Sequence, residues 1–157
     1  MFEKRLVAGW GDMDFNSQLR NPALLDKSAD VRMMFFSENG LPMEEFIRLK
    51  IGPVIRKDEI EYFKEIRLLE ELRVTLGLAG LAEDGSRFIL RNEFWRADGQ
   101  LAAKVTSSGG WLDLSLRKLA VPSAALLTAL RSLPQTEDYQ TLSSSIKPGG
   151  GLKDRGS

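Results

Sequence analysis

The chain of 157 residues contains no cysteine and no histidine. Without cysteine it has no disulfide and no thiol nucleophile, which is compatible with a reducing compartment. Without histidine, serine–histidine catalytic pairs, histidine proton shuttles and the common mixed zinc sites are excluded. If the protein is an enzyme, we therefore expect its acid or base to be a carboxylate, and we expect no metal.

Net charge and long apolar runs are absent as well. The 22 basic and 22 acidic side chains cancel, so an anionic partner has to be bound by a local basic cluster, and a nucleic-acid surface is not expected. No segment approaches the roughly 20 apolar residues of a membrane span. The first residues, MFEKRLVAGWGD, lack the apolar core of a signal peptide. These features predict a cytoplasmic protein without a membrane span.

The length of the chain suits one domain with its own hydrophobic core. From residue 134 onward the composition becomes polar, and the last stretch, SSSIKPGGGLKDRGS, is rich in serine and glycine. Such a composition is typical of disordered segments. We expect a single domain over residues 1–133 and a flexible tail over residues 134–157.

One long helix is predicted to begin at Asn21, which is a good N-cap. Pro22 then falls at the first helical position, where its missing N–H costs nothing. Gly40 can adopt the left-handed conformation that ends helices, and Pro42 follows it. The apolar side chains of this helix spread beyond a single stripe, so we expect a curved sheet to wrap around it.

Four downstream segments alternate apolar and polar side chains with the period of a strand. Two Asp-Gly turn signals separate the last three of them, which favours antiparallel hairpins. A break in the last strand is expected at Gly109-Gly110, and a short helix is expected near the end of the domain. The strands cover residues 52–66, 73–82, 88–96 and 101–114. The sequence thus predicts an α+β fold with a long central helix and an antiparallel sheet.

The stretch GWGDMDFNS places Asp12 and Asp14 in a short polar loop before the helix. A calcium loop can begin in this way, but it needs Gly at position 6 and Glu at position 12, where this chain has Ser17 and Ala23. A phosphoaspartyl enzyme needs alternating βα units, which the pattern does not show. From the residues alone, both aspartates can be turn formers whose carboxylates accept hydrogen bonds from nearby amides.

The same stretch resembles the hotdog-fold acyl-CoA thioesterases of the 4-hydroxybenzoyl-CoA thioesterase type. In that family a D-x-D-x-x-G-H-x-x-N pattern precedes the central helix, and Asp12, Asp14 and Asn21 match it at the same spacing. The order of the expected elements matches over most of the chain. Ser17 and Gln18 replace the Gly-His pair of the pattern. Gln18 can form hydrogen bonds but cannot carry a titrating proton.

The resemblance implies a hotdog fold and hydrolysis of an acyl-CoA or acyl-carrier-protein thioester, with Asp14 as the catalytic carboxylate. Asp14 could attack the carbonyl directly or take a proton from water. Gln18 is expected beside it, and Asp12 is expected to organise the loop. Because Ser17 and Gln18 depart from the pattern, the alternative is a non-catalytic hotdog protein that binds acyl thioesters.

The implied oxyanion site is the N-terminus of the central helix, where backbone N–H groups and the helix dipole favour negative charge. Pro22 has no N–H. Asn21 is therefore the expected backbone donor, with Ala23 or Leu24 as alternatives.

Coenzyme A carries phosphates, so the resemblance also implies a local basic site. The candidate residues are Arg87, Arg91, Arg56 and Lys57. Arg87 ranks first because the family often places nucleotide contacts near this hairpin, although such charges can also be solvated surface groups. No cofactor is implied apart from the coenzyme A of the substrate.

A sheet wrapped around one helix leaves an open edge strand, and proteins avoid long open edges. Hotdog domains pair these edges across a dimer and form their active sites at the interface. We therefore expect a homodimer or a dimer of dimers, that is, a homotetramer.

Overall fold

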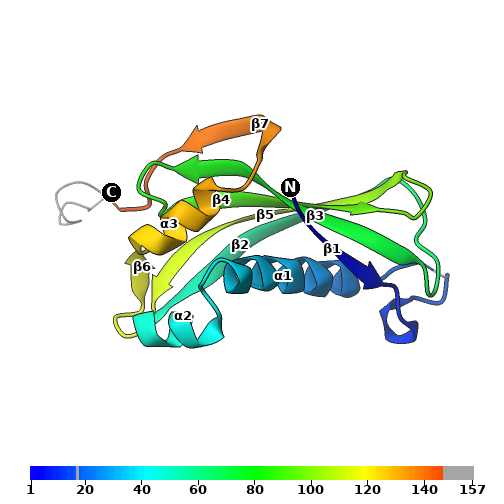
Figure 1. Cartoon of the computed structure of the whole chain (residues 1–157), viewed down its shortest axis with the longest axis horizontal. Helices are drawn as coiled ribbons and strands as arrows, with labels where there is room; N and C mark the ends of the chain where they lie inside the picture. Colours follow the sequence, from blue (N-terminus) through cyan, green and yellow to red (C-terminus); the bar gives the residue numbers. More distant parts are fainter. Residues whose placement is uncertain (17, 147–157) are drawn as a thin grey trace.

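The structure is a computed structural model that describes residues 1–16 and 18–146 of the chain. A long helix, α1, lies against one face of a curved sheet (Figure 1). The helical segments are η1 (Trp10–Asp12), α1 (Asn21–Glu38), α2 (Met43–Leu49) and α3 (Ala124–Arg131). The strands are β1 (Phe2–Val7), β2 (Ile51–Tyr62), β3 (Glu71–Ala82), β4 (Arg87–Trp95), β5 (Leu101–Asp113), β6 (Lys118–Ala120) and β7 (Gln135–Leu142). The predicted α+β class, with a long helix wrapped by an antiparallel sheet, is confirmed.

The strands of the described residues form one sheet in the order β1-β3-β4-β5-β2. All neighbours on this path are antiparallel. Two shorter pairings extend this sheet. Strand β6 pairs with β5 on the side of β4, just past the point where β4 begins. Strand β7 pairs with β3 on the side of β1, just past the residues that pair with β1. Strand β2 is therefore at an edge of the sheet, and among the described residues it pairs only with β5.

The apolar side of α1 is covered by the sheet and by α2. Phe36 of α1 packs edge-on against Phe46 of α2 and Trp111 of β5, with ring centroids 5.6 and 6.0 Å away. The indole of Trp111 is fully buried, and its N–H donates to the carbonyl oxygen of Gly85 at 3.0 Å. Burial on more than one side explains why the apolar residues of α1 exceed a single stripe.

The start of α1 differs by one position from the prediction. The N-cap is Arg20, Asn21 is the first helical residue, and Pro22 is the second. The N–H of Leu24 donates to the carbonyl oxygen of Arg20 at 3.1 Å, so helical hydrogen bonding begins one residue earlier than expected. The side chain of Asn21 accepts a hydrogen bond from Tyr62 instead of capping the helix. The predicted end is confirmed, because Gly40 follows α1 with a φ of 80°.

The predicted break at Gly109-Gly110 is wrong, because β5 runs through both glycines. They permit close approach of backbone rather than ending the strand. A Cβ atom at Gly109 would lie 2.1 Å from the carbonyl oxygen of Val54, and one at Gly110 would lie 2.7 Å from that of Ser86.

Replacing Gly109 with alanine is expected to lower the free energy of unfolding by about 3 kcal/mol, because the ladders on both sides of β5 prevent the backbone from moving away. Urea unfolding measures this change. Gly11→Ala is the control, since a Cβ atom there meets nothing within 4 Å. If Gly109→Ala were as stable as the wild type, the close approach of β2 and β5 would be refuted.

The predicted flexible tail begins too early. Residues Gln135–Leu142 form β7, which pairs in parallel with β3. The expected boundary at residue 133 therefore falls before a strand that belongs to the sheet. The polar composition misled the prediction because β7 is an exposed edge strand, held by backbone pairing rather than by apolar burial. Residues 147–157 of the expected tail lie outside the described part of the chain.

Within the described residues, the longest helix, α1, is too polar to cross a membrane, and the other helices are too short.

Candidate active site

Asp14 lies in a small hairpin between η1 and α1. Met13 and Leu19 form an antiparallel bridge at its base, and the N–H of Asp14 donates to the carbonyl oxygen of Gln18 at 2.8 Å. The Oδ1 atom of Asp14 accepts the N–H groups of Asn16 and Gln18 at 2.8 and 2.9 Å. Its Oδ2 atom has no hydrogen-bond partner among the described residues, and the side chain is exposed. Asp14 thus organises its own turn, and one of its carboxylate oxygens is left without a partner in the part of the hairpin that the structure describes.

The carboxylate of Asp12 is bound by neighbouring groups of the chain. Its Oδ2 atom accepts the N–H of Gly9 at 2.7 Å and pairs with Lys27 of α1 at 3.0 Å. Lys27 also donates to the carbonyl oxygen of Val7 at 3.1 Å. Burial raises the pKa of Asp12, but the Gly9 N–H and Lys27 outweigh burial and hold this pKa below its usual range. The contacts of Asp12 therefore join β1, the hairpin and the helix.

The N-terminus of α1 offers two backbone donors, of which Asn21 lines the same hollow as Asp14. Among the described residues, neither Asn21 nor Ala23 donates its N–H to a backbone or side-chain acceptor. Pro22 has no N–H, and the N–H of Leu24 is occupied by Arg20. Ser17 lies outside the described part of the chain, so its departure from the family pattern has no structural account.

A hollow of about 430 Å³ brings the predicted residues Asp14, Gln18 and Asn21 together with Tyr62 from the end of β2. The Tyr62 hydroxyl donates to Oδ1 of Asn21. Burial, and then the negative charge of Asp14, raise the pKa of Tyr62. Its phenol is therefore neutral and able to donate at neutral pH. No local pattern indicates Tyr62, because 41 residues separate it from Asn21 along the chain.

A second hollow of about 520 Å³ adjoins the other side of Asp14. Trp10 and Phe15 line it together with Leu68, from the segment that joins β2 to β3. Trp10 is 82% exposed and Phe15 is 92% exposed. Exposed apolar side chains that gather around one hollow mark ligand-binding or interaction sites more often than isolated ones do. Asp14 thus lines both the hollow of Tyr62 and this second one, which we call the aromatic hollow after Trp10 and Phe15.

Three of the four predicted basic residues lie together in a pocket that does not include Asp14. Arg56, Lys57 and Arg87 line a pocket of about 350 Å³ formed by β2, β4 and β5. Arg87 donates to the hydroxyl of Ser143, just beyond β7, at 3.1 Å. Among the described residues, Arg56 has no ion-pair partner. The pocket combines positive charge with hydroxyl donors, which suits an anionic group.

Arg91 does not join this pocket. Its guanidinium holds the Asp138 carboxylate of β7 through two hydrogen bonds of 2.7 and 3.0 Å, and it also donates to Thr106 at 3.0 Å. The hydrogen bonds from Arg91 lower the pKa of Asp138 below its usual range, and Thr136 adds to this effect. Arg91 therefore links β4 to β7 through Asp138, and its guanidinium is not available to the basic pocket.

The basic pocket and the Asp14 hollow lie at opposite ends of β2. Val54 lines the first and Tyr62 lines the second. A strand rises about 3.3 Å per residue, so these eight steps span roughly 26 Å. The two sites therefore do not touch within one chain.

Comparison with known proteins places this arrangement in a family. A model of the thioesterase-like superfamily matches residues 8–130. A search of curated proteins found no match. The similar solved structures include a hypothetical protein from Staphylococcus aureus in complex with CoA, with 18% identity, a TM-score of 0.77, and coverage of 90% of this chain and 87% of that one.

Two further neighbours have thioesterase names. A 1,4-dihydroxy-2-naphthoyl-CoA thioesterase from Synechocystis has 19% identity, a TM-score of 0.74, and coverage of 84% of this chain and 96% of that one. A probable thioesterase from Escherichia coli has 18% identity, a TM-score of 0.71, and coverage of 85% and 98%. The expected resemblance to hotdog-fold thioesterases is confirmed. Because the family model spans most of the sequence, the chain belongs to the thioesterase-like superfamily.

Proposed function

We propose that the protein hydrolyses acyl-CoA thioesters, with Asp14 as the catalytic carboxylate. The observation that carries this proposal is the Oδ2 atom of Asp14, which has no partner among the described residues while two backbone N–H groups hold Oδ1 beside the N-terminus of α1. Membership of the thioesterase-like superfamily supports the reaction class, and the CoA complex of the Staphylococcus aureus neighbour supports the thiol.

Either of two steps fits this geometry. As a general base, Asp14 takes a proton from water while the water oxygen attacks the thioester carbon, and cleavage of the C–S bond releases the thiolate. As a nucleophile, Asp14 forms a mixed anhydride with loss of the thiolate, and water then cleaves the anhydride to regenerate the carboxylate. In both steps the N–H groups of Asn21 and Ala23 are the donors available to the oxyanion. The neutral Tyr62 fixes Asn21 from the side of β2.

The open edge of β2 is the proposed interface of a homodimer. Residues 55–60 read Ile-Arg-Lys-Asp-Glu-Ile, and residues 56–59 are exposed. If two copies pair antiparallel about a two-fold axis at Asp58, Lys57 faces Glu59 of the partner subunit. Lys57 and Glu59 of one chain already lie on the same face of the strand, with their charged atoms 3.6 Å apart, as facing positions across such an axis require. Opposite charges on facing positions stabilise paired strands, so this edge is complementary to itself.

The same register joins the two separate sites. Antiparallel pairing of the two copies of β2 brings Tyr62, at the end of the strand, beside the first half of β2 in the partner subunit, which lines the partner's basic pocket. Each composite site then has the Asp14 hollow of one chain and the basic pocket of the other. An extended CoA molecule needs a reactive centre and a phosphate site of this kind, well apart from each other.

Thiol release from a panel of acyl-CoAs tests the function directly. Rapid release with a preferred acyl group is the expected result. Binding of acyl-CoA without release would contradict hydrolysis and favour the non-catalytic alternative, for which Gln18 in place of the family's histidine is the motivating difference.

Arg87→Ala is expected to raise KM for acyl-CoA by about tenfold and to leave kcat nearly unchanged. A phosphate contact far from the carbonyl stabilises the ground state and the transition state alike. Steady-state kinetics with acyl-CoA and with the corresponding acyl-pantetheine separates the phosphate effect, since only the first substrate should respond. Arg5→Ala, at an exposed position on β1 outside the pocket, is the control. An equal loss with both substrates would argue against phosphate recognition by Arg87.

A further inference from the structure

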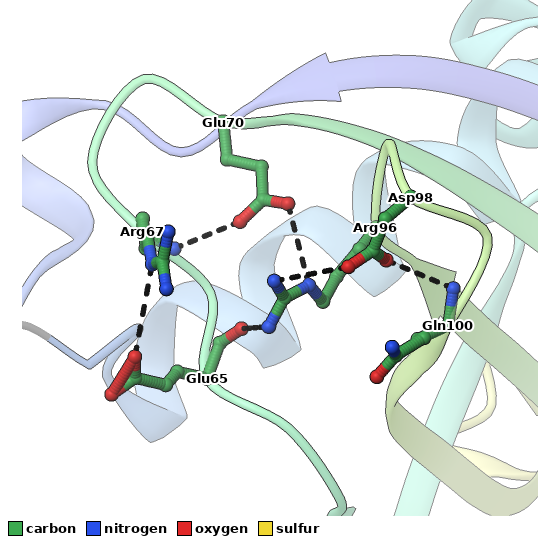
Figure 2. A network of polar contacts seen from close by, with 6 residues as sticks. All are labelled: Glu65, Arg67, Glu70, Arg96, Asp98 and Gln100. Atoms are coloured by element: carbon green, nitrogen blue, oxygen red, sulfur yellow. Dashed lines mark hydrogen bonds and ion pairs between the residues drawn. The ribbon is translucent and has the colours of Figure 1, made fainter.

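The segment that joins β2 to β3, residues 63–70, is tied to the turn between β4 and β5 by one arginine (Figure 2). The Arg96 guanidinium donates to the carbonyl oxygen of Glu65 at 3.0 Å and pairs with Asp98 at 3.1 Å. Its Nε atom lies 3.6 Å from the Glu70 carboxylate. The side chains of Arg96 and Glu70 are 15% and 14% exposed. No other ion pair of the described residues has both partners this well shielded, so water screens this pair less than the surface pairs.

Glu70 also closes the 63–70 segment onto itself. Its second carboxylate oxygen accepts the N–H of Arg67 at 3.1 Å, and its own N–H donates to the carbonyl oxygen of Arg67 at 3.1 Å. Between them, Leu69 has a φ of 63°, in the left-handed region that residues with a side chain rarely adopt. Such a conformation persists where the surrounding contacts fix it. The contacts of Glu70 supply that constraint.

This segment holds the start of the Asp14 hairpin by its backbone. The N–H of Leu69 donates to the carbonyl oxygen of Ala8 at 2.7 Å, and the N–H of Ala8 donates to the carbonyl oxygen of Glu70 at 3.1 Å. Ala8 is fully buried, and the next residue, Gly9, donates to Asp12. The preceding residue of the segment, Leu68, lines the aromatic hollow beside Asp14, together with Trp10 and Phe15. Contacts thus connect Arg96 through the 63–70 segment to two places beside Asp14. One is Leu68, which lines the hollow, and the other is Ala8, at the start of the Asp14 hairpin.

We propose that Arg96 and Glu70 are positioning residues for the thioester reaction. They fix the 63–70 segment so that Ala8 anchors the Asp14 hairpin and Leu68 forms a wall for the acyl group. Neither residue touches Asp14, and both act through the backbone. The inference rests on the proposed function and adds to it a class of acyl group, namely apolar chains or rings long enough to lie against Leu68.

Glu70→Gln tests the proposal because it removes the charge and keeps the size of the side chain. We expect amide hydrogen exchange at Ala8 and Leu69 to become about tenfold faster. We also expect kcat/KM for octanoyl-CoA to fall about tenfold relative to acetyl-CoA, because a displaced Leu68 acts only on an acyl group that reaches it. A purely structural effect would lower activity with both substrates in equal proportion. Arg96→Lys is the second variant, since it keeps the charge but cannot reach three acceptors.

Arg67→Ala is the matched control in the same segment. It removes the exposed pair with Glu65, where the charged atoms are 3.8 Å apart, and leaves the backbone contacts of residue 67 in place. Arg67→Ala should change neither the amide hydrogen exchange of Ala8 and Leu69 nor the ratio of kcat/KM for octanoyl-CoA to that for acetyl-CoA. Unchanged exchange and an unchanged octanoyl-to-acetyl ratio in Glu70→Gln and Arg96→Lys would overturn the proposal. A wild type that hydrolyses no thioester would overturn the proposed function, whereas exchange at Ala8 and Leu69 would still decide whether the pair holds the segment.

Discussion

Asp14→Asn is expected to lower kcat for thioester hydrolysis by about a thousandfold, because the variant can neither accept a proton from water nor attack a carbonyl. The asparagine side chain keeps an oxygen that can accept the N–H groups of Asn16 and Gln18. The hairpin should therefore fold as in the wild type, and the loss should lie in chemistry. Thiol release, measured together with the unfolding temperature, separates these two effects.

Asp113→Asn is a matched control for Asp14→Asn. The Oδ1 atom of Asp113 also accepts two backbone N–H groups of its own turn, from Ser115 and Leu116 at 2.9 and 2.8 Å. It lines neither hollow beside Asp14. The control should keep full activity. Full turnover in Asp14→Asn would reject the mechanism while leaving the fold assignment intact. Rapid-quench mass spectrometry of the wild type would distinguish the two steps, since only the nucleophilic step adds the acyl mass to Asp14.

Lys57→Glu is expected to weaken the homodimer by about a hundredfold. In the proposed register the variant places a carboxylate at position 57 opposite Glu59 of the partner subunit, and the two-fold axis repeats this repulsion. Activity should fall together with dimer content, because each composite site takes its basic pocket from the partner. Sedimentation equilibrium over a range of protein concentrations measures the dissociation constant.

The charge-swapped double variant, Lys57→Glu with Glu59→Lys, makes this test specific to the register. It exchanges the two facing charges and restores their attraction, so dimer affinity should recover to within about threefold of the wild type. Recovery of activity is expected to be smaller, since Lys57 also lines the basic pocket. A double variant that dissociates as readily as Lys57→Glu alone would show that residues 57 and 59 do not face each other.

The long helix and the central strands could be predicted because their signals are local. Alternation of apolar residues marks β3, β4 and β5, and Gly40 marks the end of α1. Strand β7 could not be predicted, because its residues are mostly exposed and its order depends on pairing with β3 and on the Arg91–Asp138 tie. The pairing partners are distant in sequence, so no local pattern reveals them.

The candidate site was predictable only in part, for the same reason. Asp14, Gln18 and Asn21 lie within eight residues of one another, and their motif could be read directly. Tyr62 and Leu68 reach Asp14 through the path of β2 and the segment that follows it. Arg91 was a basic candidate ranked after Arg87, but strand β7, which the sequence did not predict, provides it with Asp138. The roles of these residues in catalysis and in CoA binding stay predictions.

The contact of Phe36 with Trp111 has a consequence for synthesis of the chain. Helix α1 leaves the ribosome about 75 residues before the tryptophan that covers it, an interval of roughly 4–15 s at ordinary rates of translation. During this time the strands that bury α1 are incomplete, and its apolar side chains face solvent or a chaperone. The helix at the centre of the finished domain is thus open to aggregation while the chain is being made, and faster completion of β5 would protect it.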